Sequence, residues 1–431
     1  MKKILIALVV ALPIVFLFQG CEDRTEISAP VLSTGSANFS RYFAVGNSLT
    51  AGYQSGALYK SGQEYSYARL MSMQMGTSFE TPWVSDPGLA PGRIEVQSFN
   101  PATGSLVTKI NTANGAPTNL GYTGIYNNLG IPGATLVDFF STTSSANSVS
   151  PGNAYFDVIL RSTTASPNTM WSSLKAAKPT FVSFWLGNND ILGYATSGGT
   201  VGHTPTAVFG AIYKQAMDSL KTLNAGVVVM NIPDVSKLPY FTTVGPALIR
   251  AGTPQIVGVD KDGVVRAMDL TKVYLTLPSQ AQLAAGFGAP TKPLPSAYIL
   301  DEAEIVEVQT TTAAFNTIIA TESAAKGFAL ADLNAFFNEI ATTVSTKGAY
   351  VVEGIPFTLS YFTGQIFSLD GVHITSRANG IVANKIIDAI NAKYGSNLSK
   401  VTVASLPGSY VFSSSPVQSV TFSHGFPTLA F

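Results

Sequence analysis

The sequence predicts an α/β fold in which helices cover both faces of a central parallel sheet, giving three layers. Short apolar segments that resemble buried strands alternate with longer segments whose apolar residues recur at helical spacing. Glycine or proline punctuates the ends of these segments. Because a parallel pair of strands needs a crossover connection that is usually a helix, this alternation favours the layered parallel arrangement.

The first half of the chain contains two predicted strands and one predicted helix. Residues 42–45 form a short apolar run, and residues 181–186 form the clearest buried strand. Between them, residues 64–75 are rich in methionine and favour a helix, whereas 77–128 are rich in Gly, Pro, Asn and Thr and predict loops or irregular strands. The Ser/Thr-rich stretch 141–150 predicts another loop.

In the second half, predicted helices and strands alternate. The helices are expected at 206–223, 301–325 and 377–394, and the strands at 227–232 and 328–330. Gly226, Gly327 and Gly395 stand where these helices should end, and Thr375 or Ser376 could cap the last one. The segments therefore supply both helices and strands to the same sheet.

Two segments do not fit the alternation. Residues 235–300 are rich in proline, and we interpret them as an insertion above the strand ends, within one domain that spans 40–399. Residues 400–431 alternate in polarity and predict a β-like C-terminal extension.

Composition excludes several classes of protein. The chain has 431 residues, of which 46% are hydrophobic, so it is too apolar to be disordered. Its 25 basic and 25 acidic residues balance, and only 12% of residues are charged, which argues against a nucleic-acid partner. A single cysteine excludes a disulfide framework and a cysteine-rich metal site.

The N-terminus has the pattern of an export signal. Lys2 and Lys3 precede the apolar run 4–18, which is shorter than the roughly 20 residues of a membrane-spanning helix. We therefore expect a signal peptide over 1–20. The lone Cys21 follows directly, and this arrangement resembles the bacterial lipoprotein signal, in which such a cysteine is cleaved free and acylated.

The lipoprotein resemblance implies an anchor in the cell envelope. A lipidated Cys21 would attach the chain to a membrane, and the following Glu22 favours the outer membrane over inner-membrane retention. Residues 21–39 contain Ser, Thr, Pro and Gly and predict a flexible tether. The alternative is an ordinary signal peptide followed by a cysteine by chance.

Three short motifs carry candidate chemistry. Ser48 follows a predicted strand and Gly46, which places its hydroxyl at the mouth of the sheet, where ligands bind in such folds. The amide of Asn189, after the strand 181–186, could face a developing oxyanion. Asp370 stands three residues before His373, close enough to stabilise an imidazolium. Each motif alone is more simply a turn or a surface site, but the three together favour catalysis.

The motifs occur in an order that resembles the SGNH, or GDSL, hydrolase superfamily. Four blocks match in family order across residues 42–394: Phe-Ala-Val-Gly-Asn-Ser-Leu-Thr-Ala-Gly at 43–52, Asn-Leu-Gly-Ile-Pro-Gly-Ala-Thr at 128–135, Leu-Gly-Asn-Asn-Asp at 186–190 and Asp-Gly-Val-His at 370–373. The resemblance implies the SGNH-type α/β/α fold with a flavodoxin-like parallel sheet. It leaves the insertion and the C-terminal extension unexplained.

The resemblance also implies a mechanism. Ser48 would be the nucleophile, His373 the general base and Asp370 the residue that orients His373. The backbone N–H groups of Ser48 and Gly133 and the side-chain amide of Asn189 would form the oxyanion hole. No metal or organic cofactor is expected. The family usually has aspartate where this chain has Asn47, a change that should alter local hydrogen bonding without abolishing activity.

The expected activity is hydrolysis of a carboxylic ester through an acyl-enzyme intermediate. The substrate would be a lipid or an acylated glycan, and the sequence does not separate these two. Five apolar residues of the insertion could wall an acyl pocket or could equally be the insertion's own core: Leu238, Tyr240, Phe241, Leu248 and Ile249. The alternative function is a non-catalytic envelope lipoprotein that binds a ligand on the same scaffold.

Overall fold

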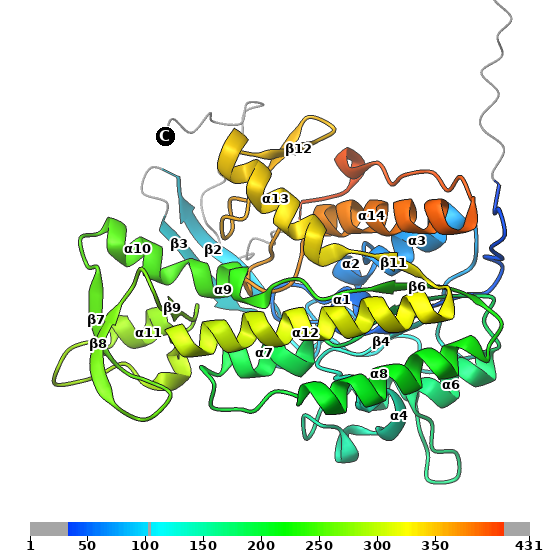
Figure 1. Ribbon diagram of the computed structural model, residues 1–431, viewed down its shortest axis with the longest axis horizontal. Coiled ribbons are helices and arrows are strands. Elements are labelled where there is room, and N and C mark those ends of the chain that lie inside the picture. The colour runs from blue at the N-terminus through cyan, green and yellow to red at the C-terminus, as the bar shows by residue number, and fades with distance from the viewer. Residues whose placement is uncertain (1–32, 102–104, 409–431) are drawn as a thin grey trace, which may run out of the picture. The chain divides into compact units, whose positions relative to one another are not determined.

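The computed structural model describes residues 33–101 and 105–408, and its central layer is a five-stranded parallel sheet (Figure 1). The strand order is β11-β6-β5-β1-β4, so the strands counted along the chain lie in the order 2-1-3-4-5 of flavodoxin-like sheets. The predicted three-layer α/β fold is confirmed. The strands are β1 (Tyr42–Gly46), β4 (Asn128–Gly130), β5 (Phe181–Trp185), β6 (Gly226–Met230) and β11 (Ala329–Ala331).

The two faces of the sheet bury separate apolar cores. Successive strand residues point to opposite faces, so Tyr42 packs in one core and Phe43 in the other. The first core is covered by α3 (Tyr67–Met75), α13 (Leu333–Lys347) and α14 (Ser376–Tyr394). The second is covered by α5 (Tyr155–Leu160), α6 (Met170–Ala177), α7 (Asn189–Thr196), α8 (Thr206–Lys221) and α12 (Glu302–Lys326). Figure 1 shows α14 and α3 on one side of the sheet and α8 and α6 on the other.

Helix ends follow the expected signals with one exception. Thr375 caps α14 by accepting a hydrogen bond from the Ala378 N–H at 3.1 Å. Gly327 and Gly395 end α12 and α14 with φ of 72° and 67°, a backbone conformation that glycine adopts at low cost. Gly226 does not end a helix; it begins β6, and α8 ends earlier.

Short elements fill the connections. The loop-rich region 77–128 includes a hairpin of β2 (Ile94–Asn100) and β3 (Ser105–Ile110), which the composition did not distinguish from loop. The remaining short elements outside the insertion are α1 (Ser48–Ala51), α2 (Lys60–Gln63), α4 (Asp138–Ser141), η1 (Ser145–Asn147), β12 (Tyr350–Val352), β13 (Ile355–Phe357) and η4 (Val403–Ser405).

The insertion 235–300 follows the carboxyl end of β6 and has a small apolar cluster of its own. The Tyr240 N–H donates to the Gly371 carbonyl oxygen at 2.9 Å, which ties the insertion to the loop that precedes α14. Its elements are η2 (Val235–Lys237), α9 (Pro239–Thr242), α10 (Val244–Arg250), β7 (Gln255–Val259), β8 (Val265–Asp269), β9 (Tyr274–Leu275), α11 (Ser279–Ala284), η3 (Ser296–Tyr298) and β10 (Ile299–Leu300).

Both domain boundaries need correction. The predicted tether is wrong for residues 33–39, because Phe39 is buried and its ring centroid lies 4.8 Å from that of Phe181. The predicted β-like extension is wrong for residues 400–408, which contain a 3-10 turn but no strand. Val403 there is fully buried against the core under α14. Apolar side chains in both segments complete that core, so the domain extends beyond 40–399.

Several predictions lie outside the described residues. They concern the signal peptide 1–20, the lipidated Cys21, the first part of the tether and the end of the C-terminal extension. Among the helices in 33–101 and 105–408, none is long and apolar enough to cross a membrane.

Candidate active site

Ser48 lies at the first position of α1, immediately after β1. The turn between them requires Gly46, because a Cβ there would lie 2.8 Å from the Trp185 carbonyl oxygen. The side chain of Asn47 caps α1 by accepting from the Leu49 N–H at 3.1 Å. The strand, the glycine and the cap together place Ser48 at the carboxyl end of β1, at the edge of the sheet.

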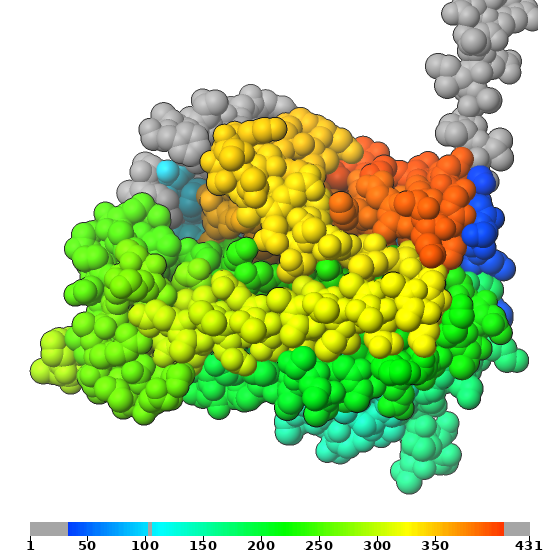
Figure 2. All heavy atoms as spheres, viewed as in Figure 1, coloured from blue at the N-terminus to red at the C-terminus, as the bar shows by residue number. Residues whose placement is uncertain are grey.

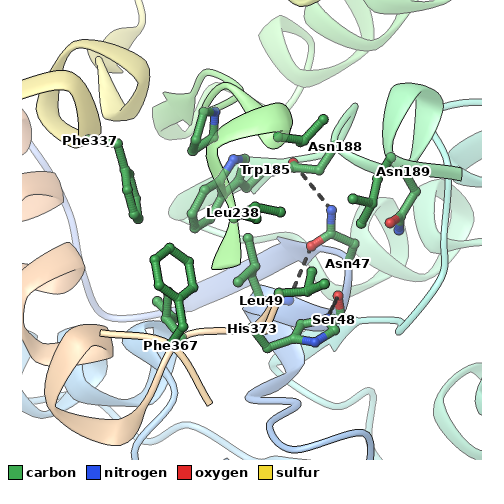
Figure 3. A pocket seen from close by; sticks show the side chains of 15 residues that line it. Asn47, Ser48, Leu49, Trp185, Asn188, Asn189, Leu238, Phe337, Phe367 and His373 are labelled. Carbon is green, nitrogen blue, oxygen red and sulfur yellow. Dashed lines mark hydrogen bonds between the residues drawn. The ribbon is translucent and has the colours of Figure 1, made fainter. Parts of the chain in front are cut away.

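His373 and Asp370 reach Ser48 from the far end of the chain. The Ser48 Oγ lies 2.8 Å from the His373 Nε2, and the His373 Nδ1 lies 2.9 Å from an Asp370 carboxylate oxygen. Figure 3 shows the Ser48 and His373 side chains pointing toward each other. Ser48 is only 7% exposed. The structure therefore brings together the three residues that the sequence singled out as a set.

Hydrogen bonds to both oxygens hold the Asp370 carboxylate. The oxygen that faces His373 also accepts from the Gly56 N–H at 2.9 Å. The other oxygen accepts from the N–H groups of Val372 and His373 at 2.9 and 2.8 Å and from the Ser368 hydroxyl at 3.2 Å. Burial by itself raises the pKa of Asp370, but the adjacent His373 and these donors outweigh it and hold the pKa at about 2. Asp370 is thus ionised at neutral pH.

A tight turn near Ser48 was not anticipated from the sequence. Ser55 and Gly56 have φ of 50° and 79°, and this turn presents the Gly56 N–H to Asp370. Tyr53 donates its hydroxyl to the Gly56 carbonyl, and its ring centroid lies 4.7 Å from the His373 ring centroid. Tyr53 therefore contacts both the imidazole and the turn that holds its carboxylate partner. The only sign of this turn in the sequence is Gly56 itself.

Gly133 and Asn189 lie beside Ser48 and His373 around one open cleft of about 360 Å³, whose lining mixes polar and apolar residues. Gly133 follows β4 and has a φ of 80°, whereas Asn189 begins α7. The Asn189 amide donates one hydrogen bond to the Ala134 carbonyl at 2.8 Å. Since an amide NH₂ carries two hydrogens, one remains for a ligand.

Asn188, which the sequence analysis did not single out, connects the two strand ends. Its side-chain oxygen accepts from the Asn47 amide at 3.3 Å (Figure 3). Asn47 uses both ends of its amide, one for the α1 cap and one for this bond. An aspartate at position 47 could keep the cap but could not donate to Asn188.

A second cavity extends from Ser48 in another direction and is apolar. It has a volume of about 50 Å³, and beyond the asparagines and His373 its lining is Ser48, Leu49, Trp185, Leu192, Pro233, Val235, Leu238, Phe337, Phe367, Val372 and Ile374. Of the five insertion residues proposed for a pocket, only Leu238 lines it. Tyr240 and Phe241, on α9, pack in the second core of the sheet, whereas Leu248 and Ile249, on α10, pack in the insertion's own apolar cluster.

The other histidine of the described residues lies elsewhere. The His203 Nε2 is 2.9 Å from a Glu307 carboxylate oxygen, on α12. Within 33–101 and 105–408, no three His, Cys, Asp or Glu side chains are grouped so that they could hold a metal ion. His424 lies outside the described residues.

Comparison with known proteins places most of the chain in one family. Residues 42–386 match the family model described as GDSL-like lipase/acylhydrolase. None of the curated proteins matches the chain.

Three solved structures are similar to this chain at low sequence identity. A Parabacteroides merdae protein described as a GDSL-like lipase is 11% identical, with a TM-score of 0.36, over 83% of this chain and 99% of its own. An extracellular lipase from Streptomyces rimosus is 14% identical, with a TM-score of 0.35, over 81% and 98%. The acetyl xylan esterase AlAXEase is 14% identical, with a TM-score of 0.30, over 60% and 78%.

Proposed function

Since this chain belongs to the GDSL-like lipase/acylhydrolase family, and is thereby an ester hydrolase, we propose that Ser48 is its nucleophile, with His373 as base and Asp370 as the residue that orients it. The observation that carries this proposal is the continuous chain of contacts from the Ser48 Oγ to His373 and on to Asp370, at 2.8 and 2.9 Å. A serine hydroxyl is a weak nucleophile without an adjacent base, and the geometry supplies one.

The reaction proceeds in two steps. His373 takes the proton from Ser48 as the Ser48 Oγ attacks the ester carbonyl carbon, and then returns that proton to the departing alcohol. Water, deprotonated by the same imidazole, next attacks the acyl-enzyme and releases the acid and free Ser48. The ionised Asp370 accepts from the Nδ1 of His373 throughout, which stabilises the transient imidazolium.

The oxyanion hole is assigned to three N–H donors. They are the backbone N–H groups of Ser48 and Gly133 and the second amide hydrogen of Asn189, and these three residues all line the open cleft. A developing negative charge in this cleft would meet donors already fixed by β4, α1 and α7.

The fate of the N-terminus forms part of the proposal. Export through the signal peptide 1–20 and acylation of Cys21 would hold the hydrolase at the cell envelope, in the outer membrane. The pattern Lys-Lys, apolar run, Gly-Cys supports this. Mass spectrometry of the protein purified from its host membrane should find lipid on Cys21 and residues 1–20 removed, and an unmodified Cys21 would refute the anchor.

The test of the catalytic assignment combines turnover with covalent labelling. The full-length protein should hydrolyse p-nitrophenyl esters, and Ser48→Ala should lose at least about 10³-fold in kcat/KM. A serine-reactive phosphonate should label the wild type and not Ser48→Ala. Ser150→Ala is the matched control for labelling, because Ser150 lines the same cleft without a histidine partner. A folded protein that neither turns over an ester nor takes the label would instead be a ligand-binding lipoprotein.

A further inference from the structure

We infer that Leu238, Phe337 and Phe367 form a side-chain gate within the acyl-binding pocket, and that this gate limits the length of the acyl group that is cleaved. The inference rests on the proposed function, because it takes Ser48 as the point from which the acyl group extends. It concerns the apolar cavity described above, called the inner pocket from here on.

The inner pocket suits an acyl chain better than an alcohol. Its polar lining residues, Asn47, Ser48, Asn188, Asn189 and His373, belong to the Ser48 end of the cavity described above, and the rest of its lining is apolar. The open cleft that also borders Ser48 is wider, with about 360 Å³, and polar residues make up a larger share of its lining. An ester bound at Ser48 would bury most apolar surface by placing its acyl chain in the inner pocket and its alcohol in the cleft.

A third cavity, the outer pocket, borders the inner one. It has a volume of about 20 Å³ and shares four lining residues with the inner pocket: Pro233, Leu238, Phe337 and Phe367. The side chains of these shared residues therefore separate the two spaces. Figure 3 shows Phe337, Phe367 and Leu238 gathered on the side of the pocket away from Asn189.

The gate residues differ in how firmly they are held. Phe367 is 2% exposed and packs in the core, whereas Phe337 on α13 and Leu238 after η2 are only partly buried. The ring centroids of Phe337 and Phe367 lie 6.2 Å apart. Phe337 is therefore the member whose removal should open the passage with least damage to the core.

The outer pocket ends at the surface in polar groups. Lys237 donates to the Asn338 side-chain oxygen at 2.9 Å and so joins η2 to α13 across this end. In Figure 2 a strip of green surface, from the segment that follows β6, is visible between α12 and α13. The outer pocket is lined from the segment 233–238, α13 and the loop before α14, so an acyl chain passing the gate would run between η2 and α13 toward solvent.

The volumes set the expected chain length. A water-sized group needs roughly 10–15 Å³ of such a cavity. The inner pocket, with a volume of about 50 Å³, therefore holds about three to five groups of an acyl chain. The wild type should therefore prefer butyryl to hexanoyl esters. Phe337→Ala removes the ring that helps to separate the two pockets, and the joined space should admit decanoyl or longer chains.

The experiment compares kcat/KM for p-nitrophenyl esters from acetyl to palmitoyl in the full-length protein. Phe337→Ala should raise the decanoate-to-butyrate ratio of kcat/KM at least about tenfold over wild type. Phe140→Ala is the matched control, since Phe140 is likewise a half-buried phenylalanine but lines neither pocket, and it should leave the ratio unchanged. Ala341→Phe, which fills the outer pocket alone, should cancel the gain in the Phe337→Ala background.

Each outcome is decisive. An unchanged chain-length profile in folded Phe337→Ala, with activity that still depends on Ser48, overturns the gate and leaves the catalytic proposal standing. If Phe337→Ala fails to fold, as judged by near-ultraviolet circular dichroism, Phe337→Leu must show the same shift in smaller degree or the gate is wrong. If the folded wild type hydrolyses none of the esters, the catalytic proposal and the gate are both overturned.

Discussion

Replacing Asp370 with asparagine should disable catalysis while leaving the protein folded. Both carboxylate oxygens serve only as acceptors, one for Gly56 and His373 and the other for Val372, His373 and Ser368. An amide NH₂ must therefore face donors in either orientation. If it faces His373, the imidazole takes the tautomer that carries its hydrogen on Nε2 and can no longer accept the Ser48 proton.

Two magnitudes follow from this geometry. Loss of the correct tautomer typically lowers kcat by about 10⁴-fold. The environment lowers the pKa of Asp370 from 3.8 to about 2, which corresponds to roughly 2–3 kcal/mol in favour of the ionised folded state. A lowered acid pKa stabilises the fold above the unfolded pKa near 4, and this contribution disappears as pH falls through 2. The difference in unfolding free energy between wild type and Asp370→Asn should therefore shrink toward pH 2.

The assay measures kcat on p-nitrophenyl butyrate and urea unfolding at pH 7 and pH 3. Asp260→Asn provides a matched control, because Asp260 also accepts from two backbone N–H groups and an arginine but lies in the β7–β8 turn. It should keep wild-type kcat. A kcat for Asp370→Asn within tenfold of wild type would refute the reasoning, because an imidazole that no carboxylate orients would then support catalysis almost as well.

Three further changes test other parts of the site and fold. Asn189→Ala should lower kcat by about 10²–10³-fold with little change in KM, and an unchanged kcat would remove Asn189 from the oxyanion hole. Tyr53→Phe loses the bond to Gly56 but keeps the ring against His373, so urea unfolding should show a loss of about 1 kcal/mol with kcat/KM reduced less than tenfold. Burial raises the pKa of Glu304 from 4.5 to about 7, so its contribution to stability is full below pH 4.5 and is lost as pH rises through 7. Glu304→Gln should therefore gain stability over wild type between pH 5 and pH 8, by up to roughly 3 kcal/mol, and a constant difference across that range would contradict this.

Sequence patterns were sufficient to predict the layers of this protein and to select the groups that we propose as reactive. Strand and helix periods are local, and the glycines and Thr375 that end or begin helices act within a few residues, so a linear pattern reveals them. The order of Ser48, Asn189, Asp370 and His373 was equally legible, because each follows a strand or precedes a helix at the same edge of a parallel sheet.

Only the tertiary structure decided what surrounds those groups. The turn at Ser55 and Gly56, which holds Asp370, acts on a residue more than 300 positions away, and no local period encodes that contact. The inner pocket is lined from five stretches of the chain, at the ends of β1 and β5, at η2, on α13 and before α14, so its size depends on how distant segments pack. Residues 33–39 were predicted as a tether and residues 400–408 as part of a β-like extension, yet apolar side chains of both segments are buried in the core under α14. The first segment packs at the end of α14, where the Ser36 N–H donates to the Tyr394 carbonyl, and the second packs at its start, where Arg377 donates to the Leu406 carbonyl. Such packing against α14 is not encoded in the composition of either segment.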